Sequence, residues 1–468
     1  VGGGAFLATL CRPDLPDLLE GLDLRQTGAE AFEDWLRSER SHWATRLEAL
    51  LPEGHGDTPE TSGAPAPGRE AGLRPAPAHG RPGFGLLSCA VAGHAPSEAL
   101  IADATLDAIV SGLVELCGVD VYDYRDTNGR LMNPGSGGFG PPWLIQMVAT
   151  PGGGSVSVHL RLRETRSGKV LWNSEPARID SMEALREPGA IPLGAFIARN
   201  VDRLARMCIT AGGVGNVLEN TPYQALAGMF RLRPGDLAQV GAMLETAYDE
   251  TRAPVHLGLM RYLDTIRAGE GIGNSEPPSR ADILHAARAV VTDDGFSPIA
   301  LSAAGYALLY LGHDRDLSAD LLRRAVELNP TQAFAWDHLA LFHFANGALG
   351  EAAQASRRAL ELGAHSPLRY TYETTGCMIA VAQGDYAEAV RCGNRALLRM
   401  PRFLPALRYT AVALAHLGRT GDARRMAAQI RALDPGFEAA AGVQSGHMPP
   451  DPTLTQRMIE GLKMAGLA

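Results

Sequence analysis

Three glycines near the carboxy-terminal end of the chain, Gly347, Gly384 and Gly418, recur at nearly constant spacing. The intervals are 37 residues (384 − 347) and 34 residues (418 − 384). An acidic residue and an alanine follow each glycine at the same two offsets: Glu351-Ala352, Glu388-Ala389 and Asp422-Ala423. A repeat of this length is a small unit that buries its apolar face only by stacking on its neighbours. We therefore expect a row of stacked units over residues 299–437.

Two more offsets complete the pattern: seven positions after each alanine, and a turn seventeen positions after each glycine. The first offset is occupied by Ala359, Ala396 and Ile430, and the second by Ala364, Pro401 and Pro435. The pattern resembles the tetratricopeptide repeat, a pair of helices of about 34 residues. This resemblance implies an all-α solenoid over 299–437. We expect irregular helical hairpins before it, over 217–298, and a capping helix after it, over 451–468.

Composition limits the classes of function. The 468 residues carry a net charge of −9, so the chain as a whole lacks the basic surface that nonspecific nucleic-acid binding needs. Its six cysteines form no CxxC pair, which favours buried, reduced thiols in a cytoplasmic protein. No apolar run reaches the length of about eighteen residues that indicates a membrane span.

Residues 83–210 alternate strand and helix patterns. Strands are predicted at 84–91, 119–124, 143–150, 156–163 and 169–179, and helices at 96–117 and 193–209. This order indicates a small mixed α/β domain. Together with the repeats, it gives an α+β multidomain chain in which the mixed domain precedes an all-α solenoid. Between 52 and 82 the chain is dense in Pro, Gly and Ala, so we expect a disordered linker there.

The mixed domain resembles the TolB amino-terminal-like domain of bacterial regulators. Its helix matches at Asp103, Leu106 and Ile109, and its hairpin matches at Val156, Val158, Leu160, Leu162, Ser167, Gly168, Val170, Leu171 and Trp172.

The apolar spacing within residues 1–51 predicts a helical segment there. Within it, residues 17–51 resemble the bacterial transcriptional activator domain of antibiotic-regulator (SARP) proteins, at Leu18, Leu19, Gly21, Leu22, Phe32, Trp35, Leu36, Glu39 and Arg40. In that family a winged-helix DNA-binding domain comes first. The residues before Asp17 are too few to form one. The chain opens with Val1, so we expect a fragment that would contact DNA only through a missing amino-terminal domain.

Patterns typical of enzyme and metal sites are weak. The glycine-rich stretch 135–140 is followed by two prolines instead of the Lys-Ser/Thr of a phosphate-binding loop, and Ser136 is in no G-x-S-x-G motif. His338 and His343 are five residues apart, whereas zinc pairs on a helix prefer a spacing of about four. Recurring Glu351, Glu388 and Asp422 are explained by helix starts. We expect no enzyme, no cofactor and no metal.

The repeats imply another kind of site, a concave groove lined by the first helix of each unit. We expect residues at exposed positions of this groove to bind a protein partner, and the polar and aromatic candidates are Trp336, Asp337, Asn346, Tyr370, Tyr372, Glu373, Arg408 and Tyr409. Tyrosine, tryptophan and arginine are common anchors of protein interfaces. The chain is also a candidate homodimer.

These features favour a signal-responsive transcriptional regulator that acts through protein or small-ligand contacts. Two alternatives stay open. One is a tetratricopeptide scaffold or adaptor without a DNA role. The other is the regulatory region of an adenylate cyclase, because TolB-like and repeat segments also accompany such catalytic domains.

Overall fold

The computed structural model describes residues 83–92, 96–117, 119–127, 141–187, 190–211, 221–270, 278–294, 296–312, 314–437 and 452–467. The activator-like segment, the linker predicted at 52–82 and the glycine-rich stretch 135–140 lie outside these residues.

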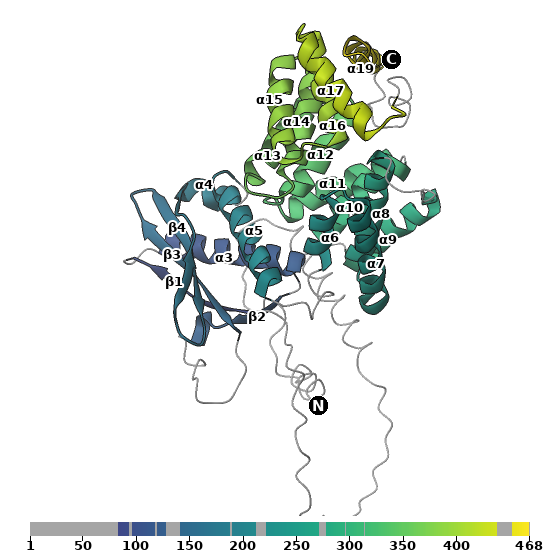
Figure 1. The fold of residues 1–468 in the computed structure, drawn as a ribbon. Coiled ribbons are helices and arrows are strands. Elements are labelled where there is room, and N and C mark those ends of the chain that lie inside the picture. The colour runs from purple at the N-terminus through teal and green to yellow at the C-terminus, as the bar shows by residue number, and fades with distance from the viewer. Residues whose placement is uncertain are drawn as a thin grey trace, which may run out of the picture. The chain divides into compact units, whose positions relative to one another are not determined.

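One mixed sheet of six strands forms the first part of the described fold (Figure 1). The strands are β1 (Gly83–Val91), β2 (Asp120–Asp123), β3 (Trp143–Pro151), β4 (Ser155–Glu164), β5 (Val170–Asn173) and β6 (Ala177–Asp180). Their order is β2-β1-β3-β4-β5, and β6 also pairs with β4. The β1 strand is parallel to β2 and β3, and the remaining pairs are antiparallel. Helix α3 (Pro96–Cys117) supplies the crossover that a parallel β1–β2 pair requires.

The single strand predicted at 169–179 is wrong, because the structure divides it into β5 and β6. These strands pair with different parts of β4. Between them, Ser174 accepts a hydrogen bond from the Leu160 N–H through its side-chain Oγ at 2.9 Å. The side chain thus replaces a backbone partner of β4, and the strand ladder is interrupted there.

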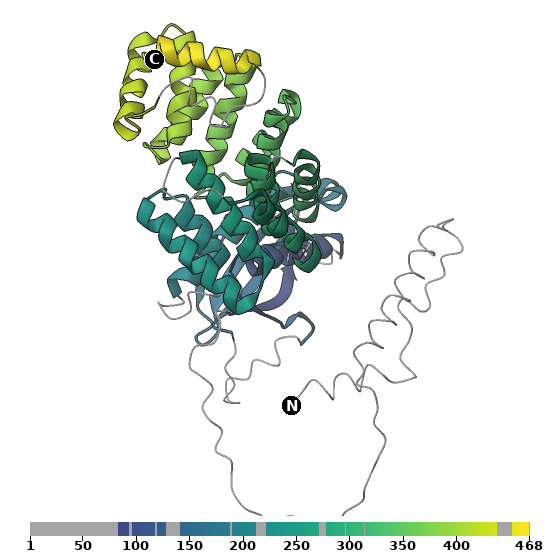
Figure 2. The same ribbon diagram turned by 90° about the vertical axis from the view of Figure 1, so that its right-hand side faces the viewer.

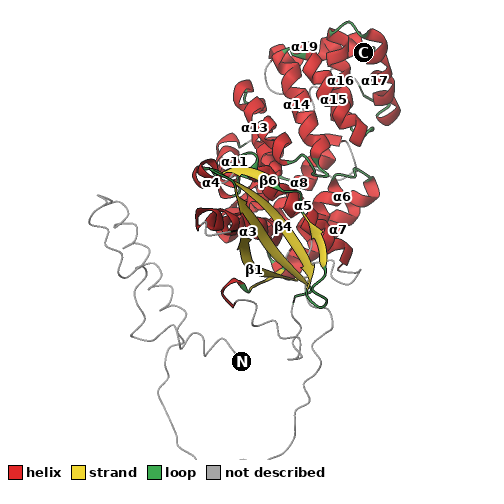
Figure 3. Ribbon diagram, turned by 90° about the vertical axis from the view of Figure 1, so that its left-hand side faces the viewer, coloured by secondary structure: helices red, strands yellow, loops and turns green. Residues whose placement is uncertain are grey.

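Alternation along β4 gives the sheet one buried face. Four residues of β4, spaced two apart, are fully buried: Val156, Val158, Leu160 and Leu162. They share a core with apolar side chains of α3 and of α5 (Leu193–Ala211). The short helix α4 (Ser181–Arg186) follows β6. Figure 3 shows the strands in front of these helices. The alternate residues of β4, Ser157, His159, Arg161 and Arg163, are half-buried and lie on the other face of the sheet.

Helices make up the rest of the described chain (Figures 1 and 2). The first four are α6 (Thr221–Met229), α7 (Pro234–Thr251), α8 (Pro254–Glu270) and α9 (Arg280–Asp294). Four hairpins follow: α10 (Pro298–Ala307), extended by the π-turn η3 (Leu308–Gly312), with α11 (Arg315–Leu328); α12 (Ala333–Ala345) with α13 (Leu349–Leu362); α14 (Arg369–Gln383) with α15 (Tyr386–Arg399); and α16 (Leu404–His416) with α17 (Thr420–Leu433). The expected fold class, a small mixed sheet followed by an all-α row of hairpins, is confirmed.

The recurring glycines end the first helix of each of the last three hairpins. Gly347, Gly384 and Gly418 have φ angles of 74°, 79° and 73°, in the left-handed region where a side chain is disfavoured. At Gly384 the turn leads directly to Asp385, whose side chain accepts a hydrogen bond from the Glu388 N–H and caps α15. The repeated acidic residue therefore lies in the first turn of the second helix, where it suits the helix dipole.

A final helix, α19 (Pro452–Met464), packs against α16 at the end of the row (Figure 2). Leu454, Met458 and Leu462 are buried in this contact. A side chain at Gly461 would come within 2.7 Å of Val412 on α16, so glycine allows the two helices to approach closely.

The sheet part and the hairpins are in direct contact. On α3, Glu115 Oε1 accepts hydrogen bonds from the Ile299 N–H at 2.7 Å and from Ser297 Oγ at 3.2 Å, at the start of α10. Arg206 of α5 donates to the His365 carbonyl oxygen at 2.9 Å. A carboxylate from one part thus caps a helix of the other, which ties the two together.

Candidate functional site

The first helices of successive hairpins line a cavity of about 160 Å³, together with α8, α19 and the segments after α6 and α17. Its apolar wall consists of Phe230, Leu232, Tyr262, Ile266, Tyr306, Tyr310, Leu341, Met378, Phe403, Pro405, Phe437, Met458 and Leu462. Its polar groups belong to Thr265, Asp337, His338, Thr371, Thr374, Thr375, Arg408 and Tyr409. A cavity of roughly 150 Å³ holds one benzene ring, so this one has room for a single side chain.

Aromatic rings form a continuous cluster along this wall. The Tyr262 ring centroid lies 5.2 Å from that of Phe334, at an interplanar angle of 82°, and 4.9 Å from that of His338. The His338 ring stacks on Tyr306 at 4.6 Å and 12°. Because these rings come from α8, α10 and α12, their contacts fix the wall of the cavity in place.

His338 contributes a ring but no charge. Its Nδ1 lies 2.8 Å from Ser302 Oγ, and burial lowers its pKa to about 3. The imidazole is therefore neutral at physiological pH.

Two charged residues at the cavity have unused hydrogen-bonding atoms. Asp337 is only 4% exposed, and among the described residues its Oδ1 has no hydrogen-bond partner. Burial raises the pKa of its carboxyl to about 7, although a hydrogen bond from Thr375 acts in the opposite direction. Arg408 lies 3.9 Å from Asp434 and 4.8 Å over the Phe437 ring, while its Nε lacks a described partner. Buried polar atoms of this kind are normally paired, so Asp337 Oδ1 can accept a hydrogen bond from a ligand and Arg408 Nε–H can donate one to it.

Of the residues expected in the groove, the structure brings Asp337, Arg408 and Tyr409 together at this cavity. Trp336 does not line this cavity; it is half-buried, and its indole N–H donates to the Pro330 carbonyl oxygen at 2.9 Å. Tyr370 is buried, and its hydroxyl donates to the Phe230 carbonyl oxygen at 2.7 Å.

Asn346 and Tyr372 lie elsewhere. Asn346 ends α12, and its Oδ1 accepts a hydrogen bond from Arg315 at 2.9 Å. Tyr372 lines a second cavity, of about 90 Å³, between the hairpins and α3 and α5. Asp202 of α5 also lines it, and burial raises the pKa of that carboxyl to about 6.

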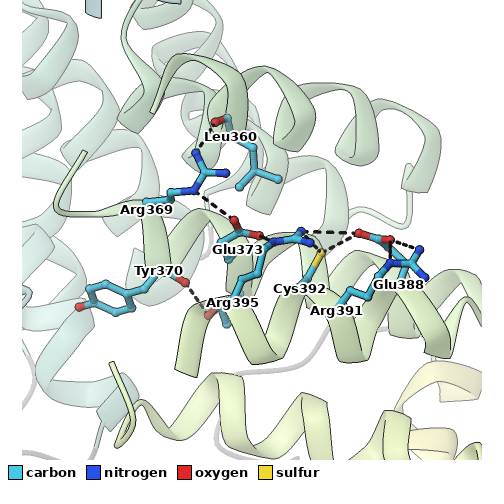
Figure 4. A network of polar contacts seen from close by, with 9 residues as sticks. Leu360, Arg369, Tyr370, Glu373, Glu388, Arg391, Cys392 and Arg395 are labelled. Atoms are coloured by element: carbon cyan, nitrogen blue, oxygen red, sulfur yellow. Dashed lines mark hydrogen bonds and ion pairs between the residues drawn. The ribbon is translucent and has the colours of Figure 1, made fainter. Parts of the chain in front are cut away.

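Glu373 belongs to an ion-pair network between α14 and α15 (Figure 4). The carboxylate is fully buried, with Oε1 3.1 Å from Arg369 Nε and Oε2 2.8 Å from Arg395 Nε. In the same network, Cys392 Sγ donates to Glu388 Oε1 at 3.1 Å. This arrangement holds the two helices of one hairpin together, and Glu373 does not line the cavity.

The expectation that the groove residues occupy exposed positions is wrong for most of them. Asp337, Tyr370, Tyr372, Glu373 and Tyr409 are all buried. Phe230, which follows α6, and Tyr262 of α8 pack against this side of the hairpins, which the repeat pattern alone does not indicate.

The repeat frame could have identified further cavity residues. Asp337, Thr374 and Arg408 each lie ten positions before a turn glycine (347 − 10, 384 − 10, 418 − 10), and His338, Thr375 and Tyr409 each lie nine positions before one. All six line the cavity. Thr374, Thr375 and His338 are therefore site residues that the sequence analysis does not include, although their offsets from the turn glycines match those of Asp337, Arg408 and Tyr409.

Within the described ranges, no group of three His, Cys, Asp or Glu side chains is arranged to hold a metal ion. None of the helices described has the length and apolar character needed to cross a membrane. The described cysteines are free thiols, and Cys117, Cys208, Cys377 and Cys392 are buried.

No family model matches the chain. No curated protein matches it either. Among solved structures, it aligns with the type IV pilus biogenesis factor PilW at 16% identity and a TM-score of 0.33, over 45% of this chain and 89% of PilW. It also aligns with YrrB, described as a TPR protein with an unusual peptide-binding site, at 16% identity and a TM-score of 0.28, over 38% and 90%. A tetratricopeptide repeat protein from Parabacteroides merdae aligns at 16% identity and a TM-score of 0.30, over 54% and 100%.

Proposed function

We propose that this chain is a protein-binding adaptor, and that its cavity between the first helices of the hairpins takes up a side chain from a segment of a partner protein. The observation that carries the proposal is the pairing of a preformed aromatic wall with two buried polar groups, Asp337 Oδ1 and Arg408 Nε, that have no described partner. Preformed apolar cavities with a few convergent polar groups are typical of binding sites.

The test is selection of peptides from a random display library on the immobilised full chain. The Met378→Trp variant places a large ring in the cavity wall, and Gln354→Trp places the same ring on the exposed outside of α13. Selected peptides should bind the wild type and Gln354→Trp equally and lose at least tenfold in affinity for Met378→Trp. Equal binding to all three proteins would contradict the proposal.

Transcriptional regulation is the second candidate, and it rests on resemblance. Its basis is the activator-like pattern of residues 17–51 and the TolB-like pattern of the mixed domain, whose hairpin turn at Gly168 has a φ of 68°. In this proposal DNA contact requires a domain outside the present sequence, and the cavity senses a partner. A gel shift with the full gene product and its promoter tests it, and absence of a shift would contradict it.

Regulation of an adenylate cyclase is a third candidate with the same TolB-like basis. It predicts that the chain changes the rate of a cyclase domain supplied with it. Turnover of a nucleotide by the purified chain alone would contradict all three non-enzymatic proposals.

A further inference from the structure

Asp337 gives the cavity a specific chemical preference. Asp337 lies on α12 and is nearly fully buried, and one of its carboxyl oxygens, Oδ1, has no hydrogen-bond partner among the described residues. Thr375 is a hydrogen-bonding neighbour that favours the ionised form of this carboxyl, and its hydroxyl also donates to the Thr371 carbonyl oxygen at 3.3 Å. Leaving a carboxylate oxygen unpaired in a buried site is costly, and a donor that carries positive charge is the partner that best offsets this cost.

The surroundings of Asp337 also favour a cation. Phe230, Tyr262, Tyr306 and Tyr310 line the same cavity, and aromatic faces attract positive charge. The one basic side chain that lines the cavity in the described structure, Arg408, stacks on Phe437 and lies 3.9 Å from Asp434. His338 is held neutral by burial. The net charge of −9 adds a long-range attraction for basic partners.

The geometry distinguishes between the two common basic side chains. A guanidinium binds carboxylates best through two parallel hydrogen bonds, which require both carboxyl oxygens. Of the two Asp337 carboxyl oxygens, Oδ1 is the one that is buried without a described partner, so a ligand finds one unpaired oxygen there. An ammonium is a compact charge that one acceptor can orient, and its methylene stem can pack along apolar walls. A volume of about 160 Å³ suits one such side chain.

We propose that the cavity binds a lysine side chain of a partner segment, with the ammonium donating to Asp337 Oδ1 and the methylene stem packed along the aromatic wall that includes Tyr262 and Tyr306. This inference rests on the proposed protein-binding function and names the residue that the cavity recognises. Acetylation of that lysine would remove the charge and one or more donors, so acetylated partners are excluded.

The experiment uses the full chain and peptides selected from the random library, each acetylated at its amino terminus so that lysine is the only amine. Affinities are measured by calorimetry for each peptide and for versions with lysine replaced by acetyl-lysine, methionine or arginine. The proteins are the wild type, Asp337→Asn, and Asp320→Asn as a matched change of an exposed carboxylate on α11.

Lysine should be enriched at one position of the selected peptides. Replacing it with methionine or acetyl-lysine should weaken binding to the wild type and to Asp320→Asn at least tenfold, and arginine should bind more weakly than lysine. Against Asp337→Asn, the lysine and methionine peptides should bind equally.

Two other outcomes separate the inference from the proposed function. Peptides that lose affinity for Met378→Trp but do not depend on lysine would overturn the lysine inference and leave the adaptor function standing. Peptides unaffected by Met378→Trp would overturn both. Because the methionine, arginine and acetyl-lysine peptides test the wild type directly, the result does not depend on whether Asp337→Asn folds.

A further control is the methionine peptide with a free amino terminus in place of the acetylated one. If this peptide binds the wild type as tightly as the lysine peptide does, the cavity binds a terminal amine, and the lysine inference is overturned.

Discussion

Burial shifts the pKa values of two adjacent residues of α12, Asp337 and His338, in opposite directions. Burial raises the pKa of the Asp337 carboxyl to about 7 and lowers the pKa of the His338 imidazole to about 3. Both shifts favour the neutral form, because a low-polarity environment penalises charge. At neutral pH the imidazole is therefore uncharged, while the carboxyl is close to its midpoint.

The pKa of Asp337 predicts a pH-dependent stability. The unfolded carboxyl has a pKa of about 3.9. Between this value and about 7 the folded state binds the proton more tightly, so the contribution of Asp337 to stability falls as pH rises through that window. Asp337→Asn should therefore raise the unfolding midpoint more at pH 8 than at pH 4.5, measured by thermal denaturation. His338 is present in both proteins, so its own titration cancels. An equal change at both pH values would contradict the assignment.

A glycine at the end of α13 makes room for a buried ring. A Cβ on Gly363 would lie 2.4 Å from Tyr372 Cε2, whereas a Cβ on Gly350, in the first turn of the same helix, would meet no atom within 4 Å. Gly363→Ala should cost about 1–3 kcal/mol of unfolding free energy through overpacking. Gly350→Ala should be neutral or stabilising by up to about 1 kcal/mol. Urea denaturation measures both, and equal effects would show that Tyr372 can move aside.

At the scale of helices and strands, local patterns predicted much of the fold. The turn glycines and the alternation of Val156, Val158, Leu160 and Leu162 required only short-range rules, so both the hairpins and the buried face of β4 could be located. The division of the strand at Ser174 depends on a bond to Leu160 of another strand. The cover of the groove depends on Tyr262 and Phe230, which belong to no repeat. Contacts between residues far apart in the chain produce no periodic pattern in the sequence, so they could not be predicted from it.

The contact between α3 and α10 predicts that one carboxylate links two parts of the fold. Glu115→Ala removes the acceptor for the Ile299 N–H and should cost about 1–3 kcal/mol. Glu115→Gln keeps a neutral acceptor and should cost less. Glu361→Ala, an exposed change on α13, is the control. The measurement is the urea midpoint of the full chain, followed by circular dichroism and tryptophan fluorescence. If all three variants match the wild type, the link contributes nothing to stability.

At the scale of the whole chain, the repeat pattern predicts part of the lining of the cavity but not what else surrounds it. The repeat pattern indicated a groove for protein partners, and Asp337, Arg408 and Tyr409 do line a cavity there. The pattern could not show that the cavity has an aromatic wall or that Asp337 Oδ1 is unpaired, because both depend on how α8 and the hairpins pack. In the account proposed here, the mixed sheet supports the hairpins through α3 and α5, and the hairpins carry the binding site.

The central claim, that a partner segment enters this cavity, can be tested by methyl NMR of the full chain labelled at methionine. Met378 and Met458 line the cavity, and Met426 lies outside it on α17. Methionine-to-leucine substitutions assign the three signals. A selected peptide should shift the signals of Met378 and Met458 in proportion to occupancy and leave that of Met426 unchanged. Binding that shifts Met426 alone, or that leaves both cavity methyl groups unchanged, would contradict the account.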